Sequence, residues 1–192
     1  MRMRAAIACL AAGWLAGCAN VQVADAPVAR IDAPAQRAGE RWIYNEINPY
    51  KKEIVGTFAE PAAGAAARQQ FGAPYTKLPY PLVPGTRWYE QIDAVDAHGV
   101  SYVWRISTSA RGWERVRTPA GEFDALRIVR IMTLGDWDGD FRDTTRIETL
   151  WYAPAANGWV RLERRDEQRE LARVPRTRID WRIWELREHN AG

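Results

Sequence analysis

The sequence predicts a mainly β protein, in which a single antiparallel meander of about nine strands forms a curved sheet or a barrel-like domain. The clearest signal lies in residues 113–165, where segments rich in β-branched and aromatic residues are separated by short breaks. These breaks contain glycine or proline and fall at residues 119–121, 135–139 and 154–158. Short breaks predict hairpins between consecutive strands. Closure or strong curvature is the usual way to protect the edges of so many strands.

The second observation is a two-residue alternation of apolar and polar side chains. One face of the predicted strand at residues 100–110 collects four large apolar side chains: Val100, Tyr102, Trp104 and Ile106. This pattern predicts a strand with one core-facing side. Residues 176–186 alternate in the same way, which favours a strand over an amphipathic helix. In residues 123–134 both faces carry apolar residues, which predicts a strand buried on both sides or interrupted by a bulge.

The N-terminal part of the domain follows the same rules. Folding is expected to begin at Gly39, where an aromatic and β-branched run replaces a stretch of Ala, Val and Pro, and a first hairpin is predicted to turn at residues 48–49. Residues 60–70 are rich in alanine and suit either a short helix or a solvated connection. Prolines crowd the next segment, which predicts an extended crossing that leads to a strand at residues 86–95. The string Gly-x-Arg-Trp occurs at residues 39–42 and again at 85–88, which suggests a weak internal repeat, with chance identity as the alternative.

The beginning of the chain has the features of an export signal. Two arginines precede an apolar run at residues 5–17 that is too short to span a bilayer. The run ends in Leu-Ala-Gly-Cys at residues 15–18, which resembles the lipobox of bacterial lipoproteins. The resemblance implies cleavage between Gly17 and Cys18 and attachment of acyl chains such as palmitate to Cys18. Several chains would make this attachment stable, whereas one chain holds a protein only marginally. An ordinary export signal with an incidental cysteine is the alternative.

These features divide the chain into three parts. They are a lipoprotein signal peptide at 1–17, a lipidated cysteine with a flexible tether at 18–38, and an antiparallel β domain at 39–190. Ala19 follows the cysteine, whereas an aspartate there commonly retains Gram-negative lipoproteins at the inner membrane. The resemblance therefore implies the outer membrane, on its periplasmic face. Cys9 is removed with the signal, so no thiol remains for a disulfide, a metal site or a nucleophile once Cys18 is acylated.

Two strings in the predicted meander resemble a pattern in uncharacterised proteobacterial outer-membrane lipoproteins. The first is Thr-Pro-Ala-Gly-Glu-Phe-Asp-Ala-Leu-Arg-Ile at residues 118–128, and the second is Trp-Tyr-Ala-Pro at residues 151–154, with Trp-Val-Arg at residues 159–161. Thr118 departs from the pattern, which usually has valine there. The resemblance covers roughly the last two thirds of the chain. It implies a mostly antiparallel β fold and an envelope location, and it brings no catalytic residue.

Charge and tryptophan content narrow the classes of function. Removing the signal takes two of the 27 basic residues, so the net charge falls from +3 to about +1. Nucleic acid is not an expected partner, because its recognition needs a clustered basic face. The chain has 10 tryptophans, one of them in the signal. We expect most of the others to fill the core or pack across strands, where a large rigid ring buries much area at low entropic cost. Stacking on sugars or a place at a membrane interface is the alternative.

An acidic turn is the best candidate for a binding site. Asp136, Asp138 and Asp140 occupy alternate positions around Gly139. Such a loop can present several oxygens to calcium if it folds back on itself. The order does not match the EF-hand spacing, and Asp-Gly is also a signal for a simple hairpin turn. The sequence therefore leaves two interpretations, a calcium site at these three aspartates and a solvated turn.

No constellation for catalysis or for a cofactor is evident. His98 and His189 are the only histidines, one in a predicted turn and one near the end of the chain, so a histidine-rich metal site is excluded. An exposed turn residue is a simpler interpretation of His98 than a general base. The sequence has no Gly-x-Ser-x-Gly elbow for a nucleophilic serine. Paired carboxylates of a glycosidase stay open, because sequence spacing does not reveal them among 24 acidic residues.

Residues 161–170 alternate arginine with acidic residues. This alternation predicts a charged strand at the rim of the sheet, or an exposed loop, that serves solubility and edge protection. Docking to an anionic partner such as an envelope polysaccharide is the functional alternative.

Together these observations predict a non-enzymatic lipoprotein that binds, or helps to assemble, envelope components. Its partners would be the membrane, through the acyl chains on Cys18, and a polysaccharide, a lipid or a protein of the envelope. No cofactor is expected. A β barrel that carries an apolar ligand or lipid is the alternative, and it explains the tryptophan content equally well. A glycan hydrolase is the third hypothesis.

Overall fold

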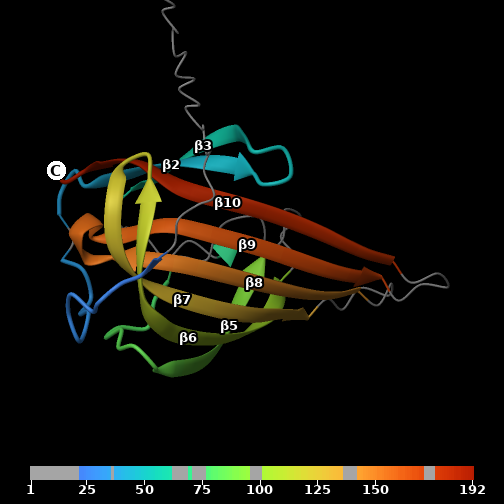
Figure 1. The fold of residues 1–192 in the computed structure, drawn as a ribbon. Coiled ribbons are helices and arrows are strands. Elements are labelled where there is room, and N and C mark those ends of the chain that lie inside the picture. The colour runs from blue at the N-terminus through green and yellow to red at the C-terminus, as the bar shows by residue number, and fades with distance from the viewer. Residues whose placement is uncertain are drawn as a thin grey trace, which may run out of the picture.

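The computed structural model describes residues 22–35, 37–61, 69–70, 77–95, 101–135, 142–170 and 176–192. Eight long strands, two strands of two residues each and one 3-10 turn make up a single sheet domain (Figure 1). The long strands are β2 (Arg41–Asn48), β3 (Glu53–Pro61), β5 (Arg87–Val95), β6 (Ser101–Thr118), β7 (Gly121–Gly135), β8 (Arg142–Ala153), β9 (Gly158–Glu170) and β10 (Arg176–Asn190). The short elements are β1 (Gln22–Val23), β4 (Gln69–Gln70) and the 3-10 turn η1 (Pro154–Ala156).

The predicted antiparallel meander is confirmed. From β5 to β10 each strand pairs antiparallel with the strand that follows it in the chain, and the strand order is β3-β2-β10-β9-β8-β7-β6-β5-β4. Strand β10 pairs with β9 on one side and with β2 of the β2–β3 hairpin on the other. The first and last long strands of the domain are therefore neighbours. Among the described residues the sheet is open, with β3 and β4 at its two edges.

A bulge bends the β6–β7 hairpin over one face of the sheet, called the inner face below. Two residues of β6, Arg111 and Gly112, stand opposite a single residue of β7. Beyond this point the hairpin leaves β8, and its tip reaches β10, where the Ala120 amide donates a hydrogen bond of 3.1 Å to the Leu186 carbonyl. Figure 1 shows the yellow end of β6 crossing the other strands. The bulge joins two segments predicted as separate strands, which accounts for eight long strands instead of nine.

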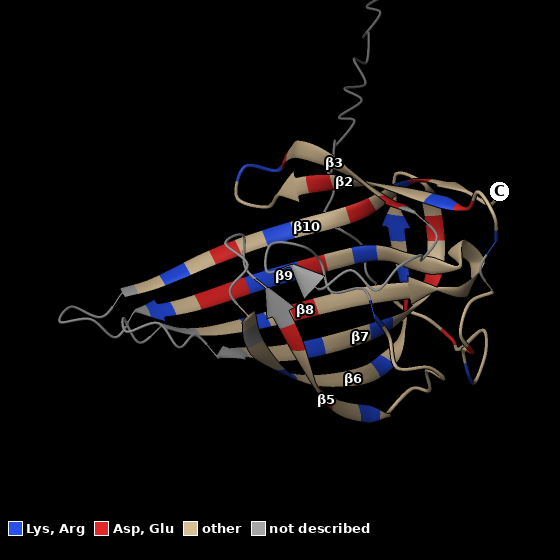
Figure 2. Cartoon of the chain, turned by 180° about the vertical axis from the view of Figure 1, so that it is seen from behind, with Lys and Arg blue, Asp and Glu red and all other residues tan. Residues whose placement is uncertain are grey.

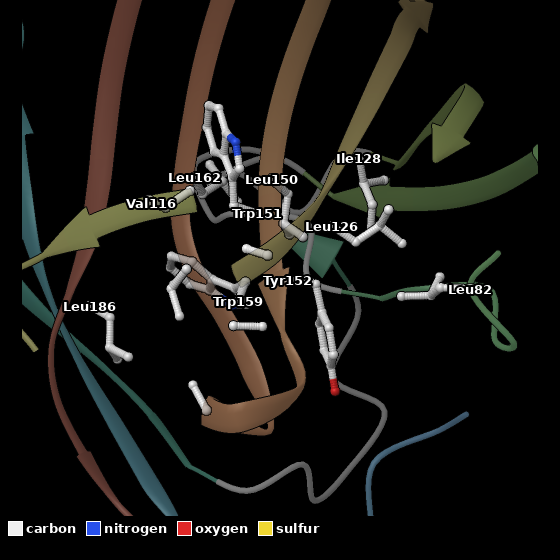
Figure 3. Packing of buried hydrophobic residues seen from close by; sticks show 14 of the residues in the cluster. Leu82, Val116, Leu126, Ile128, Leu150, Trp151, Tyr152, Trp159, Leu162 and Leu186 are labelled. Carbon is white, nitrogen blue, oxygen red and sulfur yellow. The ribbon is translucent and has the colours of Figure 1, made fainter. Parts of the chain in front are cut away.

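The apolar core lies between the inner face and this folded hairpin (Figure 3). Leu126, Leu150 and Leu162 are fully buried on β7, β8 and β9, and Val116 of the hairpin packs in the same cluster. Each fully buried leucine stabilises the fold by about 1.5–3 kcal/mol relative to an exposed one. Most described tryptophans are buried, as predicted, and these are Trp42, Trp104, Trp113, Trp151, Trp159 and Trp184.

Part of the segment predicted as a flexible tether packs on the sheet. Residues 22–23 form β1 beside β6, and Ile31 exchanges two backbone hydrogen bonds of 2.9 and 2.8 Å with Leu82. Leu82 belongs to the proline-rich segment that the sequence predicts to be extended, and its side chain is fully buried. Of residues 60–70, the first two end β3 and the last two form β4, whereas residues 62–68 lie outside the described part of the chain, so the helix and the solvated connection both stay open for 62–68.

The two Gly-x-Arg-Trp strings begin strands in the same way. Gly39 and Gly85 both have left-handed backbone angles, with φ of 79° and 88°. The arginine two residues later is the first residue of a strand in each case, Arg41 in β2 and Arg87 in β5. The shared string therefore marks one local conformation, in which glycine tolerates a positive φ immediately before a strand.

Strand β7 is buried on both faces at Ala125 and Leu126, but on one face only over residues 127–133. Leu126, Ile128 and Met132 are fully buried, whereas Ile131 on the opposite face is 48% exposed. The prediction of burial on both sides is therefore wrong for residues 127–133. A bulge does lie beside this strand, but it belongs to β6, and the pairing of β7 with β8 is regular.

Candidate functional site

Strand β9 runs through the middle of the sheet and carries charges on both faces. It lies between β8 and β10, and blue and red segments alternate along it in Figure 2. The prediction that residues 161–170 form a rim that protects an edge is therefore wrong. Arg164 and Asp166 are buried on the inner face, whereas Arg165 points away from the core and is exposed. The charges of β9 thus belong to two different sites.

The inward charges form a buried ionic network across β7, β8 and β9. Arg130 and Glu148, directly opposite one another, lie 3.2 Å apart with both side chains fully buried. Arg146 donates two hydrogen bonds of 2.8 Å to the carboxylate of Asp166. Arg164 lies 3.8 Å from the same carboxylate. Burying five charged groups is costly unless each is paired. We therefore infer that this network specifies which strands pair with one another more than it stabilises the fold.

Aromatic rings complete the surroundings of this network. The Arg146 guanidinium lies 5.2 Å from the Trp104 ring centroid, and the Arg164 guanidinium lies 5.1 Å from that of Trp184. Burial, with the nearby charge of Arg146, lowers the pKa of Arg164 below its ordinary value. A guanidinium nevertheless stays charged in proteins. Charged and aromatic side chains therefore fill the inner face beyond the apolar core.

The opposite face of the same strands carries an open groove of about 470 Å³, called the outer groove below. Its walls are the aromatic rings of Tyr50 and Trp181 and the aliphatic side chains of Ile147 and Ile179. Its polar lining consists of Thr149, Glu163 and Arg165. Strands β8, β9 and β10 form its floor, and Tyr50 reaches it from the turn between β2 and β3.

The aromatic rings of the outer groove stand at right angles. The centroids of Tyr50 and Trp181 are 5.8 Å apart, and the angle between the ring planes is 89°. Tyr50 is 64% exposed and Trp181 is 36% exposed, so both rings are available to a partner. Large exposed apolar side chains gathered in one place are characteristic of interaction sites.

Arg165 is the charge that distinguishes the outer groove. Its neighbours along β9 are already engaged, because Glu163 accepts hydrogen bonds from Arg161, and Glu167 accepts them from Arg169. Within the described residues no carboxylate lies within ion-pair distance of Arg165. Arg165 stands directly opposite Trp181 in the pairing of β9 with β10. Arg165, a cation with no ion-pair partner among the described residues, therefore lies beside an exposed indole.

The aromatic residues of the two motif strings hold the fold together. Trp159 stacks on Tyr44 with 3.6 Å between ring centroids, and its indole donates a hydrogen bond of 2.8 Å to Glu60. Trp151 donates one of 2.7 Å to Glu114. Thr118, which departs from the motif, accepts a hydrogen bond of 3.2 Å from the Ala120 amide through its hydroxyl. These contacts give the motif residues roles in packing and turn formation.

The residues predicted from sequence to form sites lie mostly elsewhere in the chain. Gly17 and Cys18, the predicted cleavage and lipidation site, lie outside the described residues, as does His98. The three predicted calcium ligands, Asp136, Asp138 and Asp140, also lie outside them, so this site stays a prediction. Within the described ranges no three His, Cys, Asp or Glu residues are grouped to hold a metal. His189 contacts Glu40 at 3.0 Å and stacks on Trp42, which ties the end of the chain to β2.

The outer groove was not identified from the sequence, although part of its signal was present. The alternation in residues 176–186 grouped Ile179 and Trp181 on one face, but an apolar face is ordinarily assigned to the core. The core-facing residues of this strand are instead Trp184 and Leu186, further along the chain. Tyr50 had no signal, because a turn residue reaches the groove only through the placement of β2 beside β10.

No helix among the described residues has the length and apolar character needed to cross a membrane. Comparisons with family models, with curated proteins and with solved structures find no match to this chain.

Proposed function

We propose that this protein is a non-enzymatic lipoprotein, anchored by Cys18 at the periplasmic face of the outer membrane, whose β domain binds an envelope component. The lipobox-like sequence at residues 15–18 supports the anchor. The observation that carries the binding role is the outer groove, where Tyr50 and Trp181 are exposed beside Arg165. Exposing apolar side chains to water is unfavourable, and a partner that covers them removes this cost.

The packing of the inner face favours this proposal over a lipid carrier. A carrier needs an interior space lined by apolar side chains. Here the inner face is occupied by the leucine core at one end and by the ionic network of Arg130, Glu148, Arg146 and Asp166 at the other. An apolar ligand placed against this network would meet buried charges, which is unfavourable.

The chemistry of the outer groove favours binding over glycan hydrolysis. Glycosidases generally need two carboxyl groups that flank the scissile bond. Among the described residues that line this groove, Glu163 is the single carboxylate, and it accepts hydrogen bonds of 3.1 and 2.6 Å from Arg161. Among the described residues, the groove therefore has no second carboxyl group to act with Glu163. We therefore expect the groove to hold its ligand without cleaving it.

Membrane fractionation of Cys18→Ser tests the anchor. We expect this variant to leave the membrane fraction and accumulate in the periplasm, because it has no thiol to acylate. Cys9→Ser is the matched control and should remain in the outer membrane, since Cys9 is removed with the signal. A Cys18→Ser protein that still sediments with the outer membrane would overturn the proposed attachment.

The released Cys18→Ser protein also tests the alternative role. Native mass spectrometry of this full-length variant, taken from the periplasm, should show the mass of the polypeptide without a lipid. A reproducible extra mass that matches a lipid would favour the carrier and would count against a filled inner face.

A further inference from the structure

The outer groove combines three chemical features within a few residues. Trp181 offers the face of an indole ring, and Tyr50 closes one side at a right angle to it. Arg165, directly opposite Trp181 across the strand pair, offers an exposed guanidinium. A ligand that fits must therefore present an apolar face and a negative charge on neighbouring parts of the same unit.

The polar lining adds hydrogen-bonding capacity to these features. Thr149 has a hydroxyl that both donates and accepts, and Glu163 has carboxylate oxygens that accept. Such mixed groups beside aromatic rings suit a ligand with many hydroxyls. A purely apolar partner would leave Thr149, Glu163 and Arg165 without water and without replacement hydrogen bonds, which is costly.

The location of the groove on a sheet face suits an extended ligand. The groove lies along β8, β9 and β10, and its floor consists of regular antiparallel strands. A polymer can lie along such a surface with several units in contact, whereas a small ligand is usually surrounded by a deeper pocket.

We infer that the outer groove binds a glycan chain bearing carboxylate groups, with one sugar ring stacked on Trp181 and its carboxylate paired with Arg165. A pyranose ring has an apolar face of C–H groups and an edge of hydroxyls, which matches the indole and the polar lining. The carboxylate supplies the negative charge that Arg165 does not find among the described residues. This inference rests on the proposed binding function and names the class of ligand.

Isothermal titration calorimetry on the full mature lipoprotein in detergent provides the test. The probes are a hexamer of galacturonic acid, which carries carboxylates, and a hexamer of N-acetylglucosamine, which is neutral. We expect the acidic hexamer to bind at least about tenfold more tightly, because hydrogen bonds to charged groups contribute more than neutral ones.

Two variants locate the binding in the outer groove. Trp181→Ala and Arg165→Gln should each weaken binding of the acidic hexamer about tenfold or more. The matched controls are Tyr89→Ala, an aromatic that is 65% exposed on β5, and Arg169→Gln, an arginine on the same strand as Arg165. Both controls should bind like the unaltered protein. Circular dichroism establishes that each variant keeps its sheet.

Several results would overturn the inference. They are absence of binding to the acidic hexamer, equal binding of the two hexamers, and unchanged binding by folded Trp181→Ala or Arg165→Gln. Concentration-dependent dimerisation that Trp181→Ala abolishes, without glycan binding, would assign the groove to a second copy of the chain. None of these results alters the fractionation of Cys18→Ser, so failure of the ligand class is distinguishable from failure of the anchor.

Discussion

Gly158 lies where the indole of Trp42 packs against the turn between β8 and β9. A β carbon at this position would be only 2.9 Å from the indole nitrogen. The ring cannot easily move, because the same nitrogen donates a hydrogen bond of 2.8 Å to the Ala156 carbonyl. The left-handed residue of this turn is Asn157, with φ of 49°, and not the glycine. Close packing, rather than backbone angle, therefore requires glycine at 158.

Replacing Gly158 with alanine should lower the free energy of unfolding by about 1–3 kcal/mol, the usual cost of an overpacked site. Gly112→Ala is the matched control, since a β carbon there would meet nothing within 4 Å. Urea unfolding followed by circular dichroism measures both variants. Equal free energies of unfolding for the two variants would show that the Trp42 ring can move away from a β carbon at position 158 without destabilising the fold.

Glu185 couples the stability of the domain to pH. Burial raises the pKa of its carboxyl group above the ordinary value, although the charge of Arg161 partly opposes this rise. The folded protein therefore holds this proton more tightly than the unfolded chain does. Such a group stabilises the fold fully at pH values below the pKa that it has in the unfolded chain. This contribution is lost as the pH rises through the pKa that it has in the folded protein.

Comparison with Glu185→Gln isolates this effect. From about pH 4 upward, the unfolding free energy of the unaltered protein should decline relative to that of the variant, since the variant has no proton to lose. Urea unfolding at a series of pH values provides the measurement. The raised pKa would be contradicted if the unfolding free energy of the unaltered protein stayed constant, or rose, relative to that of the variant as the pH increased.

At the scale of elements, the β6–β7 hairpin acts as the cover of the core. Its bulge at Arg111 and Gly112 allows one continuous pair of strands to belong to the sheet at one end and to lie across the inner face at the other. Val116 is 1% exposed as a result, although it is only five residues from the hairpin tip at Gly121. The Ala120–Leu186 hydrogen bond ties this tip to β10.

Hydrogen exchange tests this tie. Amides at hairpin tips usually exchange rapidly, but the Ala120 amide should exchange at least about tenfold more slowly than the Tyr50 amide in the β2–β3 turn. The Tyr50 amide donates to the side chain of Asn48 in an exposed hydrogen bond of 3.0 Å. Amide exchange measured by NMR reports both sites. Similar rates would mean that the hairpin tip opens from β10 easily.

At the scale of the whole molecule, local sequence patterns predicted the strands and their antiparallel order. Glycine and proline breaks placed the hairpin turns between β6 and β9, and alternation identified Trp104 and Ile106 as core residues, both fully buried. These features depend on side chains within a few positions of one another. They were therefore accessible from the sequence alone.

The features that were predicted wrongly or missed depend on contacts between distant segments. Whether residues 161–170 lie at a rim or in the centre is decided by the placement of β10, and of β2 beyond it. Alternation also does not tell which face of a strand is covered when both carry large side chains, as with Trp181 and Trp184 on β10. The outer groove lies on the face of β10 that the alternation would assign to the core, because Ile179 and Trp181 share that face.

The pairing of β2 with β10 joins segments that are far apart in the chain. Contacts such as that between Glu40 and His189 join residues 149 positions apart. In the proposed export the chain crosses the membrane from its N-terminus, so β2 lacks its neighbour until β10 has crossed. Contacts of such high sequence separation form slowly, and unpaired strand edges are prone to aggregate in the meantime. At the proposed periplasmic location, this domain should therefore depend on chaperones more than a domain of equal size built from local hairpins.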